Sequence, residues 1–418
     1  MMRSMYAGVS GLKTHQTRMD VVGNNIANVN TVGFKGSRAT FKEMLNQTLQ
    51  GARAPQGNIG GVNPQQVGLG VDVGSIDTDF NQGNLQTTGL STDLAIQGNG
   101  YFIVNDGEQD LYTRAGALTL DNNGNLVNGA NGFTVQGWMA DSDGNINNNQ
   151  SVGDIVVPVG QDMAASASTK VGFGKNLDSR ANVGDTRTAT IDVYDSLGEQ
   201  HTVSVEFEKI ADNQWDWTIT DATDAAVIYD TDGDGTNDSG SGTLTFDPVT
   251  GDIIGGMEGA LDFAPTGGAN DQTVDIDFNN VIQYAADYTI DGTSANGYEK
   301  GELESFSISD AGIITGSFSN GLTRSVGQLA VANFSNNAGL ENKGDTLFSA
   351  TSNSGIPQVG VANNAGRGSI SSGTLEMSNV DLAEQFTDMI STQRGYQANS
   401  KIIATADQML QELVNLKR

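Results

Sequence analysis

The chain contains no cysteine, which excludes disulfides, thiol nucleophiles and thiolate metal ligands. Proline is scarce, with 6 residues, whereas glycine is abundant, with 54, and hydrophobic residues make up only 37% of the chain. This composition is rich in turns without being low-complexity, and it favours many short strands joined by tight loops. A chain of 418 residues is long enough for several such domains.

Basic residues are few, 21 against 50 acidic ones, so the formal net charge is −29. Residues 1–50 carry six basic and two acidic side chains, and residues 378–418 carry four basic and five acidic, so the segment between them holds nearly all the negative charge. The near-neutral ends can pack side by side, whereas the acidic middle is solvated and repels itself. No basic stripe could neutralise phosphates, so we expect no nucleic acid partner.

Long hydrophobic runs are also missing. No apolar run reaches the roughly 18–20 residues that span a bilayer, so we expect no membrane insertion. Met1 to Met19 lacks an apolar core followed by a small-residue cleavage site, so we expect no cleaved signal peptide. The chain has no HExxH, P-loop or Ser/His/Asp arrangement, which predicts neither an enzyme nor a bound cofactor. Of its two histidines, we expect His15 to pack in a helix and His201 to lie at the surface.

Both ends of the chain carry apolar residues at a seven-residue spacing. The predicted assembly interface consists of Met5, Leu12, Met19, Val22, Ile26, Leu382, Phe386, Met389, Tyr396, Ile403, Leu410 and Leu413. A three-four spacing places each set on one face of an α-helix. Two such helices at opposite ends of a mostly β-like chain favour pairing with each other or with copies of themselves. This pattern indicates an assembly protein.

The order of patterns predicts a mainly β protein with terminal α-helices. We expect an elongated subunit in which the two helices pair at one pole and two β-rich domains are stacked outward. The expected parts are paired helices over 1–30 and 378–418, a connector over 31–75, a first β-rich domain over 76–157 and 301–377, and an inserted outer β-rich domain over 158–300.

Alternating apolar residues indicate the strands within these blocks. Leu94/Ile96 and Tyr101/Ile103 alternate around an Asn-Gly pair, which predicts a β-hairpin. In the inserted block, the alternation of Trp215, Trp217 and Ile219 predicts a strand with one buried face.

One acidic segment has metal-ligand spacing. Aspartates occupy its first, third, fifth and ninth positions, as at the start of a calcium loop: Asp230, Asp232, Asp234 and Asp238. The twelfth position is Ser241 instead of a bidentate glutamate, so calcium binding here would be weak. The alternative is an acidic hairpin turn on a solvated domain.

The two ends also resemble a known protein family. Two stretches are similar to the terminal signatures of bacterial flagellar rod and hook proteins: Asn24-Asn25-Ile26-Ala27-Asn28 with its continuation to Lys35, and Gln393-Arg394-Gly395-Tyr396. Residues 63–70 and 92–102 resemble the connector and the first β-domain of that family. The long insertion at 158–300 makes the chain most similar to the hook members.

This resemblance implies a structural subunit that polymerises into a curved, flexible tube, a universal joint that transmits motor torque from rod to filament. It also implies contacts with copies of itself and with rod, hook cap and hook-filament junction proteins. Export by the flagellar type III apparatus and a final place outside the cell are implied too. Two alternatives stay open: a distal rod or other axial subunit, and a secreted calcium-stabilised β-rich adhesin.

Overall fold

The computed structural model describes residues 2–415 except 56, 58–59, 142–143, 159, 161, 223–224, 229–239 and 266–267. The chain divides into two compact units. Unit 1 comprises Met1–Pro158, Phe306–Gly316 and Arg324–Arg418, and unit 2 comprises Val159–Ser305 and Ser317–Thr323. The described chain is mainly β with a helix near each end, which confirms the predicted fold class.

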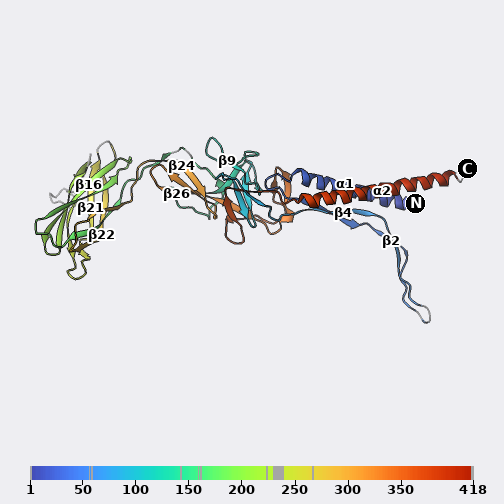
Figure 1. Ribbon diagram of the computed structural model, residues 1–418, viewed down its shortest axis with the longest axis horizontal. Coiled ribbons are helices and arrows are strands. Elements are labelled where there is room, and N and C mark those ends of the chain that lie inside the picture. Colours follow the sequence, from blue (N-terminus) through green and yellow to red (C-terminus); the bar gives the residue numbers. More distant parts are fainter. Residues whose placement is uncertain are drawn as a thin grey trace. The chain divides into compact units, whose positions relative to one another are not determined.

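The two terminal helices belong to unit 1 and lie side by side (Figure 1). They are α1 (Met2–Ala27) and α2 (Leu382–Asn415). Asp381 caps α2, because its Oδ1 accepts hydrogen bonds from the backbone N–H of Ala383 at 2.8 Å and of Glu384 at 3.3 Å. Neither helix combines the length and apolarity needed to cross a membrane, over the residues described.

Helix α1 ends at the asparagine-rich segment. The side-chain Nδ2 of Asn28 donates to the backbone carbonyl of Asn24 at 2.9 Å, which supplies a partner for the last turn. Gly33 then adopts a φ of 70°, and its N–H donates to the Glu376 carbonyl at 2.8 Å. A Cβ at this position would lie 2.5 Å from the backbone nitrogen of Ala115, so the close approach requires glycine.

Two antiparallel ribbons follow α1. The first pairs β1 (Ser37–Glu43) with β4 (Val71–Thr78), and the second pairs β2 (Asn46–Gln50) with β3 (Gln65–Gly68). Every residue of β2 and β3 is exposed, on both faces of the ribbon.

The remaining strands of unit 1 build an antiparallel sheet and two short pairs. The sheet runs β26-β11-β7-β8-β28-β27, with β9, β10, β12 and β29 attached to it, and the pairs are β5–β31 and β6–β30. The bounds are β5 (Leu85–Thr87), β6 (Leu94–Gln97), β7 (Tyr101–Asn105), β8 (Asp110–Thr113), β9 (Leu118–Leu120), β10 (Leu126–Asn128), β11 (Thr134–Met139), β12 (Gly153–Asp154), β26 (Thr323–Asn333), β27 (Glu341–Gly344), β28 (Leu347–Ser349), β29 (Gln358–Val361), β30 (Ser369–Ser372) and β31 (Thr374–Glu376). A short 3-10 helix, η1 (Asn337–Gly339), precedes β27.

The predicted hairpin at Asn99-Gly100 is wrong. Strand β6 pairs with β30, whereas β7 pairs with β8, β11 and β26. Gly100 has a φ of 134°, and a Cβ there would lie 2.5 Å from the Val331 side chain. The chain therefore passes from the β6–β30 pair into the sheet, where β7 pairs with the next strand, β8, on one edge and with β11 and β26 on the other.

Unit 2 is built from two sheets around one aromatic core. The first sheet runs β18-β21-β22-β14-β23 and the second β15-β16-β17-β19-β20. Phe173, Phe207 and Phe278 pack together with ring centroids 5.7–6.1 Å apart, and Trp215 and Trp217 are buried beside them. The predicted alternation of Trp215, Trp217 and Ile219 thus lies on a buried face, as expected.

The strands of this unit and its boundary complete the fold. Their bounds are β13 (Asp162–Met163), β14 (Lys170–Asp178), β15 (Thr186–Tyr194), β16 (Gln200–Ala211), β17 (Gln214–Ala222), β18 (Ala225–Ile228), β19 (Ser241–Phe246), β20 (Ile253–Gly255), β21 (Glu258–Pro265), β22 (Gln272–Tyr284), β23 (Asp291–Ala295), β24 (Gly301–Ile308) and β25 (Ile313–Phe318). Strands β24 and β25 contribute residues to both units.

Candidate assembly interface

The contact between α1 and α2 is centred on glycines. A Cβ added to Gly8 would lie 3.1 Å from the Ile403 side chain, and one added to Gly11 would lie 2.6 Å from the side-chain amide of Asn399. From the other helix, a Cβ at Gly395 would lie 2.6 Å from the imidazole of His15. These glycines let the two helix axes approach closely, so larger side chains from the partner helix fill the space.

Polar groups accompany this contact. Arg18 and Asp388 form an ion pair at 2.9 Å, and the Asn25 Nδ2 donates to Gln385 Oε1 at 3.0 Å. The His15 ring packs edge-on against Phe41, with 5.6 Å between ring centroids. Burial, with a smaller contribution from the Arg18 charge, lowers the pKa of His15 below its usual value. The neutral imidazole is therefore the form that fits the helix pair.

The predicted interface residues divide into three groups by exposure. Val22 is buried; Met5, Leu12, Met19, Ile26, Met389, Ile403 and Leu410 are partly buried; Leu382, Phe386 and Tyr396 are exposed. The side chain of Leu413 lies outside the described part of the chain. The structure brings Ile403 against Gly8. Sequence reasoning missed the glycines, although Gly8 and Gly11 three residues apart in a helix are costly unless close packing compensates.

Large apolar side chains remain exposed on the outer faces of both helices. On α1, Tyr6 is 66% exposed and Val9 is 50% exposed. On α2, Phe386, Ile390 and Met409 are each about half exposed. Their spacing along α2 leaves an apolar surface of the kind that marks association sites.

A buried ion cluster ties the root of the helices to the β-structure of unit 1. Glu376 Oε1 accepts from the Lys35 ammonium at 2.6 Å, and Glu376 Oε2 accepts from Arg114 Nη1 at 3.2 Å. The side chains of Lys35, Glu376 and Arg114 are 1%, 0% and 5% exposed. Burial lowers the pKa of Lys35, and the Glu376 carboxylate opposes that shift.

Backbone groups satisfy the rest of this cluster. The Gly83 N–H donates to Glu376 Oε1 at 2.9 Å, and Lys35 Nζ donates to the Asn81 carbonyl at 2.8 Å. Arg114 Nη2 donates to the Gly98 carbonyl at 2.7 Å. Lys35 follows α1 and Glu376 precedes α2, so the cluster fixes where both helices leave the β-structure. Sequence reasoning missed it, because its members are far apart along the chain.

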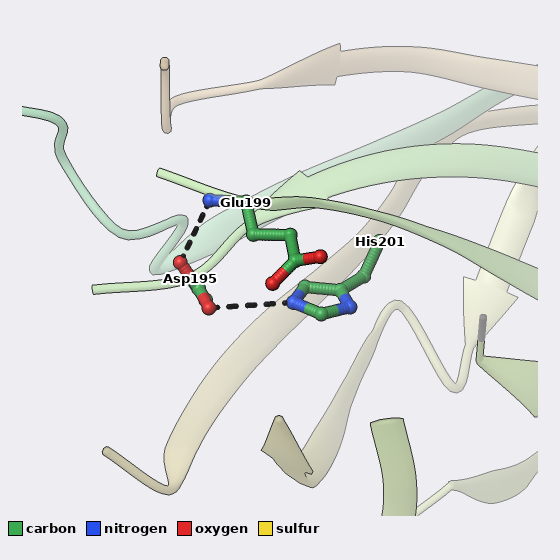
Figure 2. A group of neighbouring side chains, drawn as sticks. All are labelled: Asp195, Glu199 and His201. Atoms are coloured by element: carbon green, nitrogen blue, oxygen red, sulfur yellow. Dashed lines mark hydrogen bonds and ion pairs between the residues drawn. The ribbon is translucent and has the colours of Figure 1, made fainter. Parts of the chain in front are cut away.

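Unit 2 contains a group that could offer ligands to a metal ion. Ligand atoms of Asp195, Glu199 and His201 all lie within 4.8 Å of one another (Figure 2). Asp195 Oδ1 accepts from the backbone N–H of Glu199 at 2.9 Å and of Leu197 at 2.8 Å, and its Oδ2 lies 3.5 Å from His201 Nε2. These bonds close the turn between β15 and β16, which accounts for the arrangement without an ion.

Two sequence predictions concern the same unit. The expected surface position of His201 is wrong, because the side chain is fully buried beside Asp195. The predicted calcium ligands Asp230, Asp232, Asp234 and Asp238 lie outside the described residues.

Models of known families match most of the chain. They are described as flagella basal body rod protein over residues 5–35, flagellar hook protein FlgE/F/G D1 domain over 95–171, flagellar basal body protein FlaE D2 domain over 176–298, and flagellar basal body rod FlgEFG protein C-terminal over 371–416.

Individual relatives match over their full length. The chain is 42% identical to flagellar hook protein FlgE of Treponema pallidum and 43% identical to that of Borreliella burgdorferi, with 100% of both chains covered in each case. It is 35% identical to the Escherichia coli protein over 98% of each chain. The crystal structure of Helicobacter pylori flagellar hook protein FlgE2 matches 70% of this chain and 100% of its own, with a TM-score of 0.52 and 14% identity, which shows a shared fold.

Proposed function

The chain belongs to the flagellar hook protein family and is a structural subunit of the hook, and we propose that its paired terminal helices are the surface through which copies polymerise. The resulting polymer is a curved, flexible tube that transmits motor torque from rod to filament. The family is a structural one and not a family of enzymes.

The observation that carries this proposal is the apolar surface left on the helix pair. The glycine contact holds α1 and α2 together and turns large side chains such as Tyr6, Phe386 and Ile390 outward. Complete burial of a fully exposed side chain of this kind is worth about 1.5–3 kcal/mol, so each of these half-exposed side chains contributes about half of that. Several of them in each subunit, repeated along a polymer, are sufficient to hold a continuous inner tube together.

The division of labour along the chain is part of the proposal. Residues 1–30 and 378–418 form the inner tube, 31–75 connect it to the first β-rich domain at 76–157 and 301–377, and 158–300 form the outer domain. The matches of separate family models to 5–35, 95–171, 176–298 and 371–416 support this division. The acidic middle of the chain disfavours tight outer contacts, which leaves the outer domains free to slide during bending.

We further propose the partners and the location that hook function requires. The subunit contacts rod, hook cap and hook-filament junction proteins, and it is exported by the flagellar type III apparatus to a place outside the cell. The near-neutral helices suit later packing, because their low net charge gives little repulsion between copies.

Polar replacement of the outer helix face tests the proposal. Phe386→Ser/Ile390→Ser should raise the protein concentration needed for polymerisation at least tenfold, because two half-exposed side chains would no longer be buried between copies. Leu197→Ser is the matched control, since Leu197 is 65% exposed in a turn of unit 2. Sedimentation and electron microscopy measure the polymer. Unchanged polymerisation of the double variant would contradict the proposed interface.

A further inference from the structure

A cavity of about 710 Å³ lies in unit 1 beside the end of α1. Its apolar lining includes Val32, Phe34, Leu90 and Leu118. Two carboxylates also line it, the buried Asp93 and the exposed Asp345. A cavity of this size is in the range that binds small ligands or side chains of a partner. The hook role described above assigns nothing to it.

The wall also contains an unsatisfied donor. Asn128 lines the cavity and is 2% exposed, and its Oδ1 accepts from the Ala130 N–H at 3.0 Å. Its Nδ2 has no hydrogen-bond partner among the described residues. A buried donor left unpaired costs about 1–3 kcal/mol, so a carbonyl brought against this wall would gain a partner once the amide turned toward it.

The same unit carries an apolar segment with nothing to cover it. The ribbon of β2 and β3 exposes Leu49 by 58% and also exposes Val67, and Leu45, directly before β2, is 80% exposed. Gln47 pairs with Val67, so Leu45, two residues before Gln47, shares a face of the ribbon with Val67. An isolated two-stranded hairpin is marginal in water, which favours a surface against which this one can pack.

Charge selects this ribbon as the occupant of the cavity. Between Glu43 and Asp72 the chain has no acidic residue and a single charge, Arg53. In a protein with a net charge of −29, a segment with this single positive charge is not repelled by other copies. Arg53 is exposed and makes no ion pair with any described residue, whereas Asp345 lines the cavity and is exposed.

We propose that the β2–β3 ribbon of one copy packs into the cavity of a second copy, with apolar side chains against the exposed Leu90 and with Arg53 beside Asp345. The proposal rests on the polymerisation proposed above and adds a second contact to the one made by the helices. This contact links the connector of one subunit to the first β-rich domain of another.

Chemical crosslinking between single-cysteine variants tests this contact, and the absence of natural cysteine makes the background clean. Thr119 lines the cavity and is exposed, so Thr119→Cys marks the cavity. Leu45→Cys, Leu49→Cys and Val67→Cys mark the ribbon in a second batch of protein carrying a mass tag. The two batches are mixed, polymerised and treated with a short bismaleimide, so that only contacts between copies join tagged to untagged chains.

The expected result is a crosslink between Thr119→Cys and at least one ribbon position, joining a tagged to an untagged chain. Val249→Cys, which is 89% exposed in unit 2, is the control and should give no crosslink to Thr119→Cys. Polymers seen by electron microscopy without any ribbon crosslink would overturn the inference while leaving the proposed function intact. A crosslink from Thr119→Cys to Val414→Cys on α2 instead would also overturn it, because the helix would then be the occupant. Absence of polymers from the unsubstituted chain would refute the proposed function itself.

A charge exchange gives a second readout that needs no cysteine. Arg53→Glu should raise the concentration needed for polymerisation roughly twofold to fivefold, the effect of one surface ion pair. Asp345→Arg added to Arg53→Glu should restore it, because the pair is reformed with opposite sign. Failure of that rescue, with both variants folded, would count against the assigned contact.

Discussion

Replacing Glu376 by glutamine tests the buried ion cluster most sharply. The substitution keeps the shape of the side chain but leaves Lys35 and Arg114 as buried cations without an anion. Removing one partner from a buried ion pair destabilises a protein by about 3–5 kcal/mol, because the remaining charge is uncompensated. We expect a loss of this size in the free energy of unfolding of unit 1.

Hydrogen exchange measured by mass spectrometry separates the two units. Peptides from β7 report on unit 1, and peptides from β16 report on unit 2 as an internal reference. In Glu376→Gln, exchange in β7 should accelerate by roughly two to four orders of magnitude, the equivalent of 3–5 kcal/mol. Exchange in β16 should not change.

Two further variants decide whether charge is the cause. Asp77→Asn removes an exposed carboxylate 3.9 Å from Arg38 and should change stability by less than about 0.5 kcal/mol. Lys35→Met added to Glu376→Gln should recover part of the loss, because one uncompensated cation is then removed. The reasoning is refuted if Glu376→Gln costs less than about 1 kcal/mol, or if the added Lys35→Met makes the protein still less stable.

Two other predictions concern the helix pair. Because the pKa of His15 is lower in the folded protein than in the unfolded chain, the unfolded chain binds the proton first as pH falls. The folded state therefore keeps its full stability above the unfolded pKa near 6.5 and loses stability below it. Exchange in α1, divided by the intrinsic exchange rate of an unfolded chain at each pH, should therefore accelerate between pH 7 and pH 5, and His15→Gln should abolish that acceleration. The same acceleration in the variant would contradict the assignment. The double variant Gly11→Ala/Gly395→Ala should weaken helix pairing and polymerisation, because each added Cβ would lie 2.6 Å from a side chain of the partner helix. The control is Gly23→Ala, where an added Cβ has no atom within 4 Å; it should stabilise α1 by up to about 1 kcal/mol. Equal behaviour of these glycine variants in sedimentation would argue against the close helix contact.

Local patterns in the sequence were sufficient to predict the main elements. The seven-residue spacing located both terminal helices. The alternation of Trp215 and Trp217 located a strand with a buried face. Each of these signals depends on residues within one turn or one strand, so the chain itself carries them.

Features that depend on distant partners could not be predicted in this way. The Asn-Gly pair near Gly100 suggested a hairpin of β6 with β7, but β6 pairs with the distant β30, and the distant β11 and β26 take the edge of β7 that β8 leaves free. His201 is buried by packing that its neighbours along the chain do not indicate. The pair of Lys35 and Glu376 joins residues 341 positions apart, and only the fold brings them together.

The central claim is that the terminal helices carry assembly, and removing them tests it most directly. Electron microscopy of the full chain, concentrated in a kosmotropic salt that strengthens apolar burial, should show curved hollow tubes. Chains lacking 1–30 or 378–418 should remain folded monomers, as judged by circular dichroism and sedimentation. Tubes formed by both truncated chains would contradict the account.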